Sequence, residues 1–205
     1  MGFGLGAMQG WLGDARTTFV ANTQRLDDLD TAIGDGDHGT NMSRAFEAAA
    51  SIDFASNADP GLLLRQVGMK LLGTIGGASG ALYGTFFLTI AAGWPSQPNT
   101  PRMAKLFRAA RDAVQSRGRA EIGDKTMVDP LDAAVKSLEN EDFEAPLTES
   151  LARAAEAANA SAEETRDMLA RRGRAALLGE KSIGHVDPGA ASMALLFDVT
   201  ARHWV

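Results

Sequence analysis

The stretch that sets the fold is WLGDARTTFVANTQRLDDLDTAIGDGDHGTNM, residues 11–42. Positions three and four apart repeat along its first part, as they do on one face of a helix, namely Leu12, Ala15, Phe19, Asn22, Leu26 and Leu29. A second helical pattern begins at Met42, and an acidic, glycine-rich run, residues 30–41, separates the two. The stretch therefore predicts two amphipathic helices joined by a turn that carries unusual charge.

The same helical spacing continues along the rest of the chain, and no segment shows a convincing strand period of two. Eight segments repeat in this way, near residues 12–29, 42–49, 62–71, 81–92, 103–114, 131–138, 146–172 and 193–204. Three Asp-Pro pairs, at residues 59–60, 129–130 and 187–188, each place a capping carboxylate before a proline suited to the first helical turn. We predict an all-α fold, a bundle of eight antiparallel amphipathic helices.

Composition limits the class of protein. The 205 residues are 45% hydrophobic, which suffices for one buried core, so a single domain over residues 1–205 is expected. The 20 basic residues are outnumbered by 26 acidic ones, which disfavours nucleic-acid binding. The chain has no cysteine, which excludes disulfides and thiolate metal sites. Its longest apolar run, residues 81–92, is too short to span a membrane, and no signal peptide is evident, so a cytoplasmic location is expected.

Bundle topology brings distant loops together. Consecutive helices joined by short connections run antiparallel, so alternate loops lie at the same end of the bundle. The loops after helices one, three, five and seven are residues 30–40, 73–80, 118–129 and 173–189. The loops at the other end, near Ser56 and Asn57, near residues 94–99, and near Glu141 and Asp142, are ordinary connections. All the unusual motifs therefore fall at one end, where we expect the functional site.

The first of these loops supplies negative charge. Asp30, Asp35 and Asp37 offer the oxygen ligands that Mg²⁺ prefers, enough for one or two ions. The backbone N–H groups that open the next helix, at residues 38–41, favour phosphate at the same place. An EF-hand starting at Asp35 is excluded because its twelfth position is Phe46. An Asp-rich helix cap without a ligand is the alternative.

The other three loops contribute phosphate and base contacts, each with a structural alternative. The second loop lacks a P-loop lysine and offers the Ser79 hydroxyl and a helix N-terminus. In the third, Met127 and Gly118 suit a purine pocket, although core packing explains Met127 equally well, and Asp124 and Lys125 are expected to pair at the surface. In the fourth, Arg174 suits bidentate phosphate binding. The role of His185 stays open, and His203 is expected to lie outside the site.

With all four loops considered, the chain resembles the nucleotide-binding L subunit of dihydroxyacetone kinases, from about Trp11 onward. The residues that carry the resemblance are Leu29-Asp30, Ile33 to Met42, Gly76 to Gly80, Gly84 to Phe87, Arg117-Gly118, Gly123 to Met127 and Gly184 to Ala190. The resemblance implies a closed barrel of eight amphipathic antiparallel helices. It also implies ADP or ATP with two Mg²⁺ ions at one rim.

The resemblance also assigns roles to individual residues. The implied Mg²⁺ ligands are Asp30, Asp35 and Asp37, and the implied phosphate contacts are His38, Gly39, Thr40, Asn41, Ser79 and Gly80. The residues implied to frame the nucleotide are Gly118, Met127, Arg174, Asp187, Pro188 and Gly189. No protein nucleophile is expected in this chain, because phosphoryl transfer depends mainly on positioning and charge stabilisation.

In the family, dihydroxyacetone is bound by a separate K subunit or domain, so a K-type partner is implied. One branch uses exchanging ATP, while the other keeps ADP as a cofactor that a phosphotransferase-system M subunit rephosphorylates. A free-standing L chain leans toward the second branch. The alternatives are an L subunit of an ATP-dependent kinase for erythrulose or another small ketose, and a nucleotide-responsive regulator of a transcription factor. Assembly into a homodimer is a further expectation.

Overall fold

The computed structural model describes residues 4–53, 59–140 and 145–204, and within these ranges all regular structure is helical. The α-helices are α1 (Leu5–Ala21), α2 (Thr23–Ile33), α3 (His38–Ala50), α4 (Pro60–Thr74), α5 (Gly77–Gly93), α6 (Thr100–Gly118), α7 (Val128–Glu139), α8 (Leu147–Glu164) and α9 (Pro188–His203). Two 3₁₀ segments, η1 (Thr165–Asp167) and η2 (Ala175–Ser182), lie between α8 and α9. The connections predicted near Ser56 and Asn57 and near Glu141 and Asp142 lie outside the described residues.

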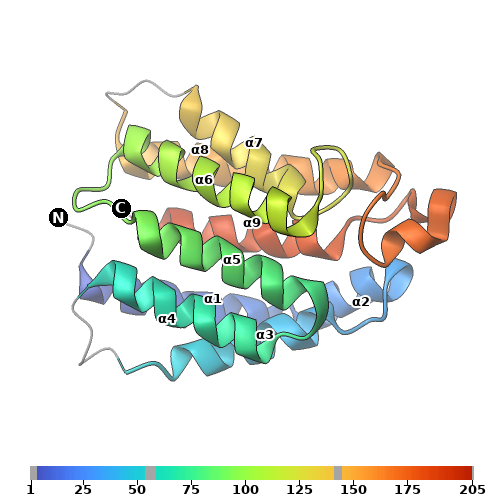
Figure 1. Cartoon of the computed structure of the whole chain (residues 1–205), viewed down its shortest axis with the longest axis horizontal. Coiled ribbons are helices and arrows are strands. Elements are labelled where there is room, and N and C mark those ends of the chain that lie inside the picture. Colours follow the sequence, from blue (N-terminus) through green and yellow to red (C-terminus); the bar gives the residue numbers. More distant parts are fainter. Residues whose placement is uncertain (1–3, 54–58, 141–144, 205) are drawn as a thin grey trace.

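Eight of the helices form a closed ring. From α3 to α9 each helix packs against the next, and α1 completes the ring by contacting both α3 and α9. Figure 1 shows the helices side by side with their axes roughly aligned, and α2 continuing beyond α1 toward the end where η2 lies. This arrangement confirms the predicted closed bundle of eight antiparallel helices.

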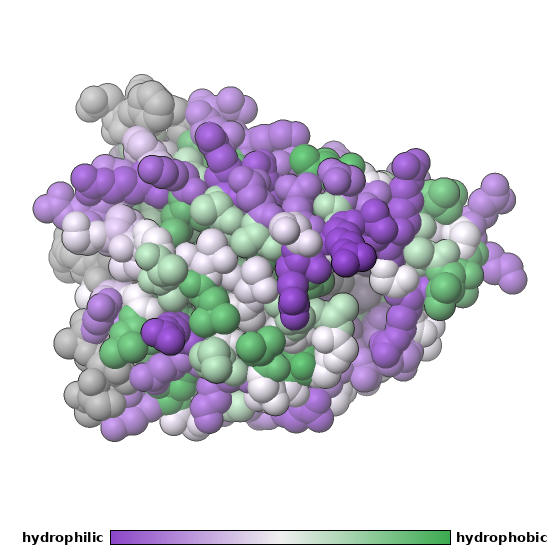
Figure 2. Space-filling view, viewed as in Figure 1, coloured by the Kyte–Doolittle hydropathy of each residue, from purple (hydrophilic) through white to green (hydrophobic). Residues whose placement is uncertain are grey.

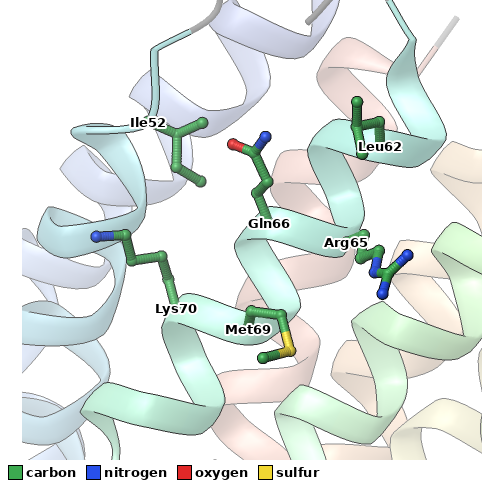
Figure 3. A pocket seen from close by; sticks show the side chains of 6 residues that line it. All are labelled: Ile52, Leu62, Arg65, Gln66, Met69 and Lys70. Carbon is green, nitrogen blue, oxygen red and sulfur yellow. The ribbon is translucent and has the colours of Figure 1, made fainter.

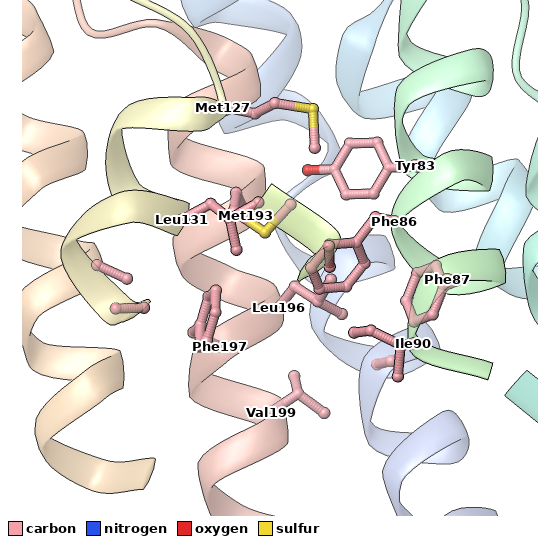
Figure 4. Packing of buried hydrophobic residues seen from close by; sticks show 14 of the residues in the cluster. Tyr83, Phe86, Phe87, Ile90, Met127, Leu131, Met193, Leu196, Phe197 and Val199 are labelled. Carbon is pink, nitrogen blue, oxygen red and sulfur yellow. The ribbon is translucent and has the colours of Figure 1, made fainter. Parts of the chain in front are cut away.

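Aromatic side chains fill the inside of the ring. Phe19 of α1 stacks on Phe46 of α3 with ring centroids 4.3 Å apart, and Trp11 lies 5.4 Å from Trp204 at the end of α9. The indole N–H of Trp11 donates to Thr200 Oγ1 at 3.3 Å, which adds a polar link between α1 and α9. Figure 4 shows residues of α5, α7 and α9 converging on one buried centre. The first and last helices are thus joined through the core.

The first predicted helix is in fact two helices, separated at Asn22. The Asn22 side-chain amide donates to Thr18 O at 2.9 Å, and the Thr23 hydroxyl lies within hydrogen-bond distance of Phe19 O and Val20 O. Such side-chain bonds to carbonyls of the preceding turn compete with the helical ladder and bend helices. The polar residue in the apolar pattern therefore marks a break that the period alone did not reveal.

The seventh predicted helix is shorter than expected. It was predicted to run to about Arg172, but α8 ends at Glu164. The Thr165 hydroxyl then bonds to Ala162 O at 2.6 Å and accepts the Asp187 N–H at 3.0 Å. Because Thr165 ties this turn to the start of α9, the following residues leave the helix axis and join the loops at the end of the bundle.

No helix among the described residues has the length and apolar character needed to cross a membrane.

Candidate functional site

The structure brings the four predicted loops together at one end of the ring. Arg174, from the fourth loop, forms an ion pair with Asp35 of the first. Arg44 donates both to Asn41 Oδ1 at 2.7 Å and to Thr74 O at 3.3 Å, so it links the first and second loops. The fourth and third loops meet where Gly189 lies against Met127. These contacts agree with the convergence that the alternation of loops predicted.

Asp30, Asp35 and Asp37 form an acidic triad at the start of α3. One carboxylate oxygen from each lies within 4.8 Å of the others, so a single metal ion can contact all three. Asp30 is buried at the end of α2, and its Oδ2 accepts the backbone N–H groups of Asp37 at 2.9 Å and His38 at 3.2 Å. Asp35 and Asp37 are exposed. The triad therefore has one fixed member and two that face solvent.

Gly34 makes room for the buried member of the triad. A Cβ atom at this position would lie 2.0 Å from Asp30 Oδ1, so any side chain would displace the carboxylate. The neighbouring Gly36 has a φ of +78°, and a Cβ there would lie 2.6 Å from Thr31 Oγ1. The glycines of the acidic run are therefore explained by the close packing of its backbone on the last turn of α2.

The charge of the triad fits divalent cations. Three carboxylates share a small volume, and the only cation that the described residues place on one of them is the exposed guanidinium of Arg174, on Asp35. Hard cations such as Mg²⁺ take oxygen ligands of this kind and usually retain waters or substrate phosphates as further ligands. The N-terminus of α3 begins at His38 directly beside the triad, so it adds N–H groups suited to a phosphate.

Asp27 is a residue of this site that the sequence analysis missed. Its carboxylate accepts the Thr40 backbone N–H at 2.9 Å and the Thr40 hydroxyl at 2.7 Å. Both polar groups of Thr40 are thus already bonded, and its predicted phosphate contact requires exchange of these bonds. Gly39 is buried, and a Cβ there would lie 2.0 Å from Thr23 O. The spacing of Asp27 one turn before Asp30 is the signal that could have shown that it faces the same loop.

His38 is buried and bonded away from the solvent. Its Nε2 lies 2.8 Å from Ser192 Oγ of α9, which also lies 2.7 Å from the hydroxyl of Tyr83 in α5. Burial lowers the pKa of His38, and the nearby carboxylates, Asp30 first among them, oppose that shift. Burial also raises the pKa of Tyr83. The ring of His38 therefore lies inside the bundle, while its backbone N–H donates to Asp30 of the triad.

The second loop places a helix N-terminus near the first. α5 begins at Gly77, which has a φ of +66°, and no side chain caps its first turn. Gly80 is buried, and a Cβ there would lie 2.1 Å from Ile75 O, which explains why glycine is needed. Ser79, predicted to contact phosphate, is partly exposed in this first turn. The turn can therefore offer N–H groups and a hydroxyl to an anion.

The third loop differs from its prediction. Asp124 and Lys125 do not pair with each other at the surface, since both are buried. Asp124 Oδ2 instead accepts from Arg172 Nε at 3.2 Å. The Lys125 ammonium donates to the backbone carbonyls of three residues in the segment before α9, namely Met168 at 3.3 Å, Ser182 at 2.6 Å and His185 at 2.5 Å. We call this arrangement the Lys125 site, and it anchors the fourth loop to the third.

α7 starts two residues earlier than the pair Asp129 and Pro130 predicted. The helix begins at Val128, so Asp129 lies inside the first turn instead of at the cap. The Asp129 carboxylate turns back to accept the N–H groups of Gly123 at 2.5 Å and Thr126 at 2.7 Å. Burial raises its pKa, and these two backbone bonds oppose that shift. Asp129 therefore shapes the third loop instead of simply capping a helix.

The residues predicted to frame a base are only partly accessible. Met127 is 4% exposed and belongs to the main core, where it points toward Tyr83 (Figure 4). Gly118 ends α6, and a Cβ there would lie 3.2 Å from Leu82 Cδ2. Pro188 is buried and Gly189 partly buried at the start of α9. Met127 thus packs in the core at the edge of the third loop, while the two glycines keep the backbone of both loops close to their neighbours.

Asp187 caps α9, and its carboxyl is a weaker acid than an ordinary aspartic acid. Its Oδ2 accepts the Ala190 N–H at 2.8 Å. Burial raises the pKa of Asp187 to about 7, the Ala190 bond opposes the shift, and the charge of Asp129 adds to it. The carboxyl therefore stays partly protonated near neutral pH. The Lys125 ammonium of the third loop lies close enough to interact with this carboxylate and favours its charged form.

The two remaining histidines lie apart from the triad. His185 is exposed, and its carbonyl is one of the three that Lys125 binds. His203, expected outside the site, lies 3.1 Å from Asp14 Oδ2 at the opposite end of the bundle, where α9 ends and α1 begins. The structure thus gives the backbone of His185 a structural role and leaves its ring at the surface.

A surface groove of about 340 Å³ lies elsewhere, along the outer face of α4. Figure 3 shows its lining, which consists of Ile52, Leu62, Arg65, Gln66, Met69 and Lys70. None of these six was predicted as a site residue, and none is a carboxylate. The groove is therefore separate from the acidic end of the molecule.

Comparison with known proteins shows the family. The DAK2 domain matches residues 32–202. A Listeria innocua protein named ADP-binding subunit DhaL of PEP-dependent dihydroxyacetone kinase 1 is 40% identical over 189 residues, covering 91% of this chain and 90% of its own. The Escherichia coli protein named ADP-binding subunit DhaL is 39% identical over 197 residues and covers 93% of both chains.

A solved structure shares the fold. The crystal structure of the dihydroxyacetone kinase from C. freundii in complex with AMP-PNP and Mg²⁺ matches 95% of this chain, with a TM-score of 0.73 and 27% identity. The match spans 33% of that longer chain. The family model, the two relatives and the shared fold all agree with the resemblance seen in the acidic and glycine-rich loops. The chain therefore belongs to the DAK2-domain family, as a DhaL-type subunit of dihydroxyacetone kinase.

Proposed function

We propose that this chain holds a magnesium nucleotide at the loop end of the bundle and transfers its terminal phosphoryl group to dihydroxyacetone bound on a separate K subunit. The acidic triad carries the proposal, because three carboxylates within 4.8 Å, beside a helix N-terminus, suit a metal-bound phosphate. Membership of a family whose relatives are named ADP-binding kinase subunits supports it.

In this proposal the triad residues are the metal ligands, and they hold two Mg²⁺ ions as the family resemblance implies. Bound Mg²⁺ would neutralise the phosphates and align the transferred group with the acceptor oxygen. Asp30 is fixed by the N–H groups of Asp37 and His38, so it sets the position of the ions. Asp35 and Asp37 face solvent, where the nucleotide arrives.

Backbone groups and one arginine complete the proposed nucleotide site. The first turn of α3, residues 38–41, and the first turn of α5, with Ser79 and Gly80, present N–H groups to the phosphates. The guanidinium of Arg174 leaves Asp35 and pairs with a phosphate oxygen when the nucleotide binds. Gly118, Met127 and residues 187–189 frame the nucleotide from the third and fourth loops.

The binding proposal is tested by removing the two exposed members of the triad. The double variant Asp35→Ala, Asp37→Ala should lose Mg²⁺-dependent ADP binding in calorimetry, while Asp28→Ala, Glu164→Ala removes equal charge from exposed positions at the same end and should bind normally. In the wild type, ADP and Mg²⁺ at about a hundredfold over Kd should raise the free energy of unfolding by about 2.7 kcal/mol. Unchanged binding in the triad variant would overturn the site assignment.

An exposed apolar patch on the segment that follows Arg174 supports action on a substrate that another subunit binds. The η2 segment follows Arg174 directly. Three apolar side chains in it or just after it are exposed, namely Leu177 (88%), Leu178 (39%) and Ile183 (45%). Figure 2 shows apolar side chains gathered at the tip of the molecule, over the η2 end of Figure 1, with polar groups around them. Exposed apolar patches with a polar rim commonly mark protein interfaces. We propose that this tip contacts the K subunit.

Reconstitution tests the partner and the reaction. The purified chain with a K-type subunit, ATP or a phosphorylated M subunit, and dihydroxyacetone should form dihydroxyacetone phosphate, and Leu177→Ser should lower that rate without changing ADP affinity. A nucleotide-responsive regulator would form no product. Replacing dihydroxyacetone by erythrulose tests the alternative substrate.

We favour the form in which ADP remains bound as a cofactor, since both relatives described above are named PEP-dependent. Native mass spectrometry of freshly purified protein tests this choice. Co-purified ADP that does not exchange with added ATP supports it, whereas a readily exchanging nucleotide points to the ATP-dependent form.

A further inference from the structure

A buried hydrogen-bonded centre joins the helices that follow three of the four loops, α3, α5 and α9. Ser192 Oγ of α9 lies 2.8 Å from His38 Nε2 at the start of α3 and 2.7 Å from the hydroxyl of Tyr83 in α5. It also donates to Gly189 O at 3.0 Å in the first turn of α9. Ser192 and Tyr83 are fully buried, and His38 is 7% exposed. One hydroxyl therefore ties together helices whose first turns are proposed to hold the nucleotide.

The number of protons on this centre decides the direction of each bond. A serine hydroxyl has one hydrogen to donate and two lone pairs to accept with, and a carbonyl can only accept. Because Gly189 O takes the one hydrogen of Ser192, the other two partners must donate to Ser192 Oγ. Tyr83 therefore donates its phenolic hydrogen, and His38 donates from Nε2. The lone pair of a neutral His38 is then on Nδ1.

We propose that Ser192 is a positioning residue, which fixes the Nε2–H tautomer and the orientation of His38 and thereby sets the first turn of α3 against the first turn of α9. This inference rests on the proposed function, since these two turns are the proposed phosphate and nucleotide contacts. His38 Nε2 points into the bundle, while its backbone N–H is held by Asp30. The same residue thus connects the metal ligand to the buried centre.

The tautomer is tested in the free protein by imidazole ¹⁵N NMR. The chain has three histidines, and the variant His38→Gln identifies the His38 signals by their loss. In the wild type, His38 should carry its hydrogen on Nε2, and in Ser192→Ala a mixture of tautomers should appear. A hydrogen on Nδ1 of the wild-type ring would overturn the inference.

Binding tests the positioning role, with Ser150→Ala as a matched control. Ser150 is also a fully buried helical serine, bonded to Thr100 Oγ1 at 3.0 Å and Pro146 O at 3.3 Å, but it lies at the opposite end of the bundle. Loss of one buried hydrogen-bonded partner is expected to weaken Mg²⁺–ADP affinity about tenfold in Ser192→Ala. Ser150→Ala should lower the melting temperature while leaving that affinity unchanged.

Conservative variants separate positioning from a general loss of stability. His38→Gln retains an N–H donor close to the Nε2 position, so it should bind the nucleotide better than His38→Ala. If Ser192→Ala and Ser150→Ala lose stability equally and both bind normally, Ser192 has no positioning role. A wild type that binds no Mg²⁺–ADP would overturn the proposed function instead, and the NMR result would still test the proton arrangement.

Discussion

The acidic triad and the Lys125 site lie at the same end of the bundle, but the first gathers negative charge and the second buries a positive charge. The Lys125 site surrounds a buried ammonium with three backbone carbonyls, so the chain provides both the cation and its acceptors. The triad gathers three carboxylates and receives one exposed arginine, on Asp35. The Lys125 site is therefore complete as folded and holds loops in place, whereas the triad keeps negative charge for a ligand to neutralise.

The largest effect is expected when Lys125, the cation that the chain itself supplies, is removed. Lys125→Met should lower the free energy of unfolding by about 3 kcal/mol, because it leaves buried carbonyls without a donor. Lys136→Met is the control, since Lys136 is mostly exposed and pairs with Asp132 on the same helix, so about 0.5 kcal/mol or less is expected. Urea denaturation measures both, and equal losses would show that the Lys125 bonds add nothing to stability.

A single methyl group at residue 34 tests whether Asp30 of the triad must be fixed. Gly34→Ala places a Cβ 2.0 Å from Asp30 Oδ1 and must displace the fixed carboxylate. We expect Mg²⁺–ADP affinity to fall at least about tenfold, equivalent to about 1.4 kcal/mol. In Gly73→Ala the new Cβ meets nothing within 4 Å, so affinity should not change. Calorimetric titration of both variants decides, and normal affinity in Gly34→Ala would mean that Asp30 need not be fixed.

The carboxyl beside the Lys125 site gives a pH-dependent test. Burial raises the pKa of Asp187 to about 7, above its ordinary 3.8, so the folded protein keeps a proton that the unfolded chain releases. Stability should therefore fall as pH rises through the interval between these two values. Asp187→Asn retains an oxygen to cap Ala190 and should lose this dependence.

The measurement compares urea midpoints of the wild type and Asp187→Asn at about pH 5 and about pH 8, in the absence of nucleotide. Shifts from other groups, such as the lowered pKa of His38, occur in both proteins and cancel in the difference. The wild type should lose more stability than the variant across the interval. Parallel profiles would mean that Asp187 ionises normally in the folded protein.

The smallest expected effect concerns the only arginine on the triad among the described residues. Arg174→Ala frees Asp35, so Mn²⁺ alone should bind about two- to threefold more tightly, as expected for an exposed ion pair. The same variant should bind Mg²⁺–ADP more weakly, because the proposed phosphate contact is lost. Titration with the metal alone and with the metal nucleotide measures these opposite changes. A change of the same sign in both would show that Arg174 does not exchange partners.

Much of the fold was predictable because it depends on local rules. Helical periodicity and the alternation of antiparallel helices are enough to place Asp35 and Arg174, 139 residues apart, at the same end. The break at Asn22 depends on side-chain bonds to specific carbonyls, which periodicity does not register. The early end of α8 depends on Thr165 bonding to the start of α9, a contact between distant parts of the chain.

The candidate site was predictable where charge accumulates in sequence and not where partners are distant. The carboxylates of residues 30–37 are visible as a cluster, and the structure brings them together. Lys125 looked like a surface partner of Asp124, because nothing local shows that its acceptors come from residues 168–185. Ser192 was overlooked within an apolar helix, although a small polar residue in such a pattern is a signal worth following.

The contact between α1 and α9 that closes the ring affects the order in which the chain can fold during its synthesis. The indole of Trp11 bonds to Thr200, so the contact that completes the ring joins residues 189 positions apart. Contacts of such long range form late, since the intervening chain must first be ordered. A ribosome that has made the acidic triad has not yet made α9, which carries Ser192 and supports the fourth loop. The emerging chain therefore cannot assemble all four loops until synthesis has passed α9, and premature capture of nucleotide by a partial chain is disfavoured.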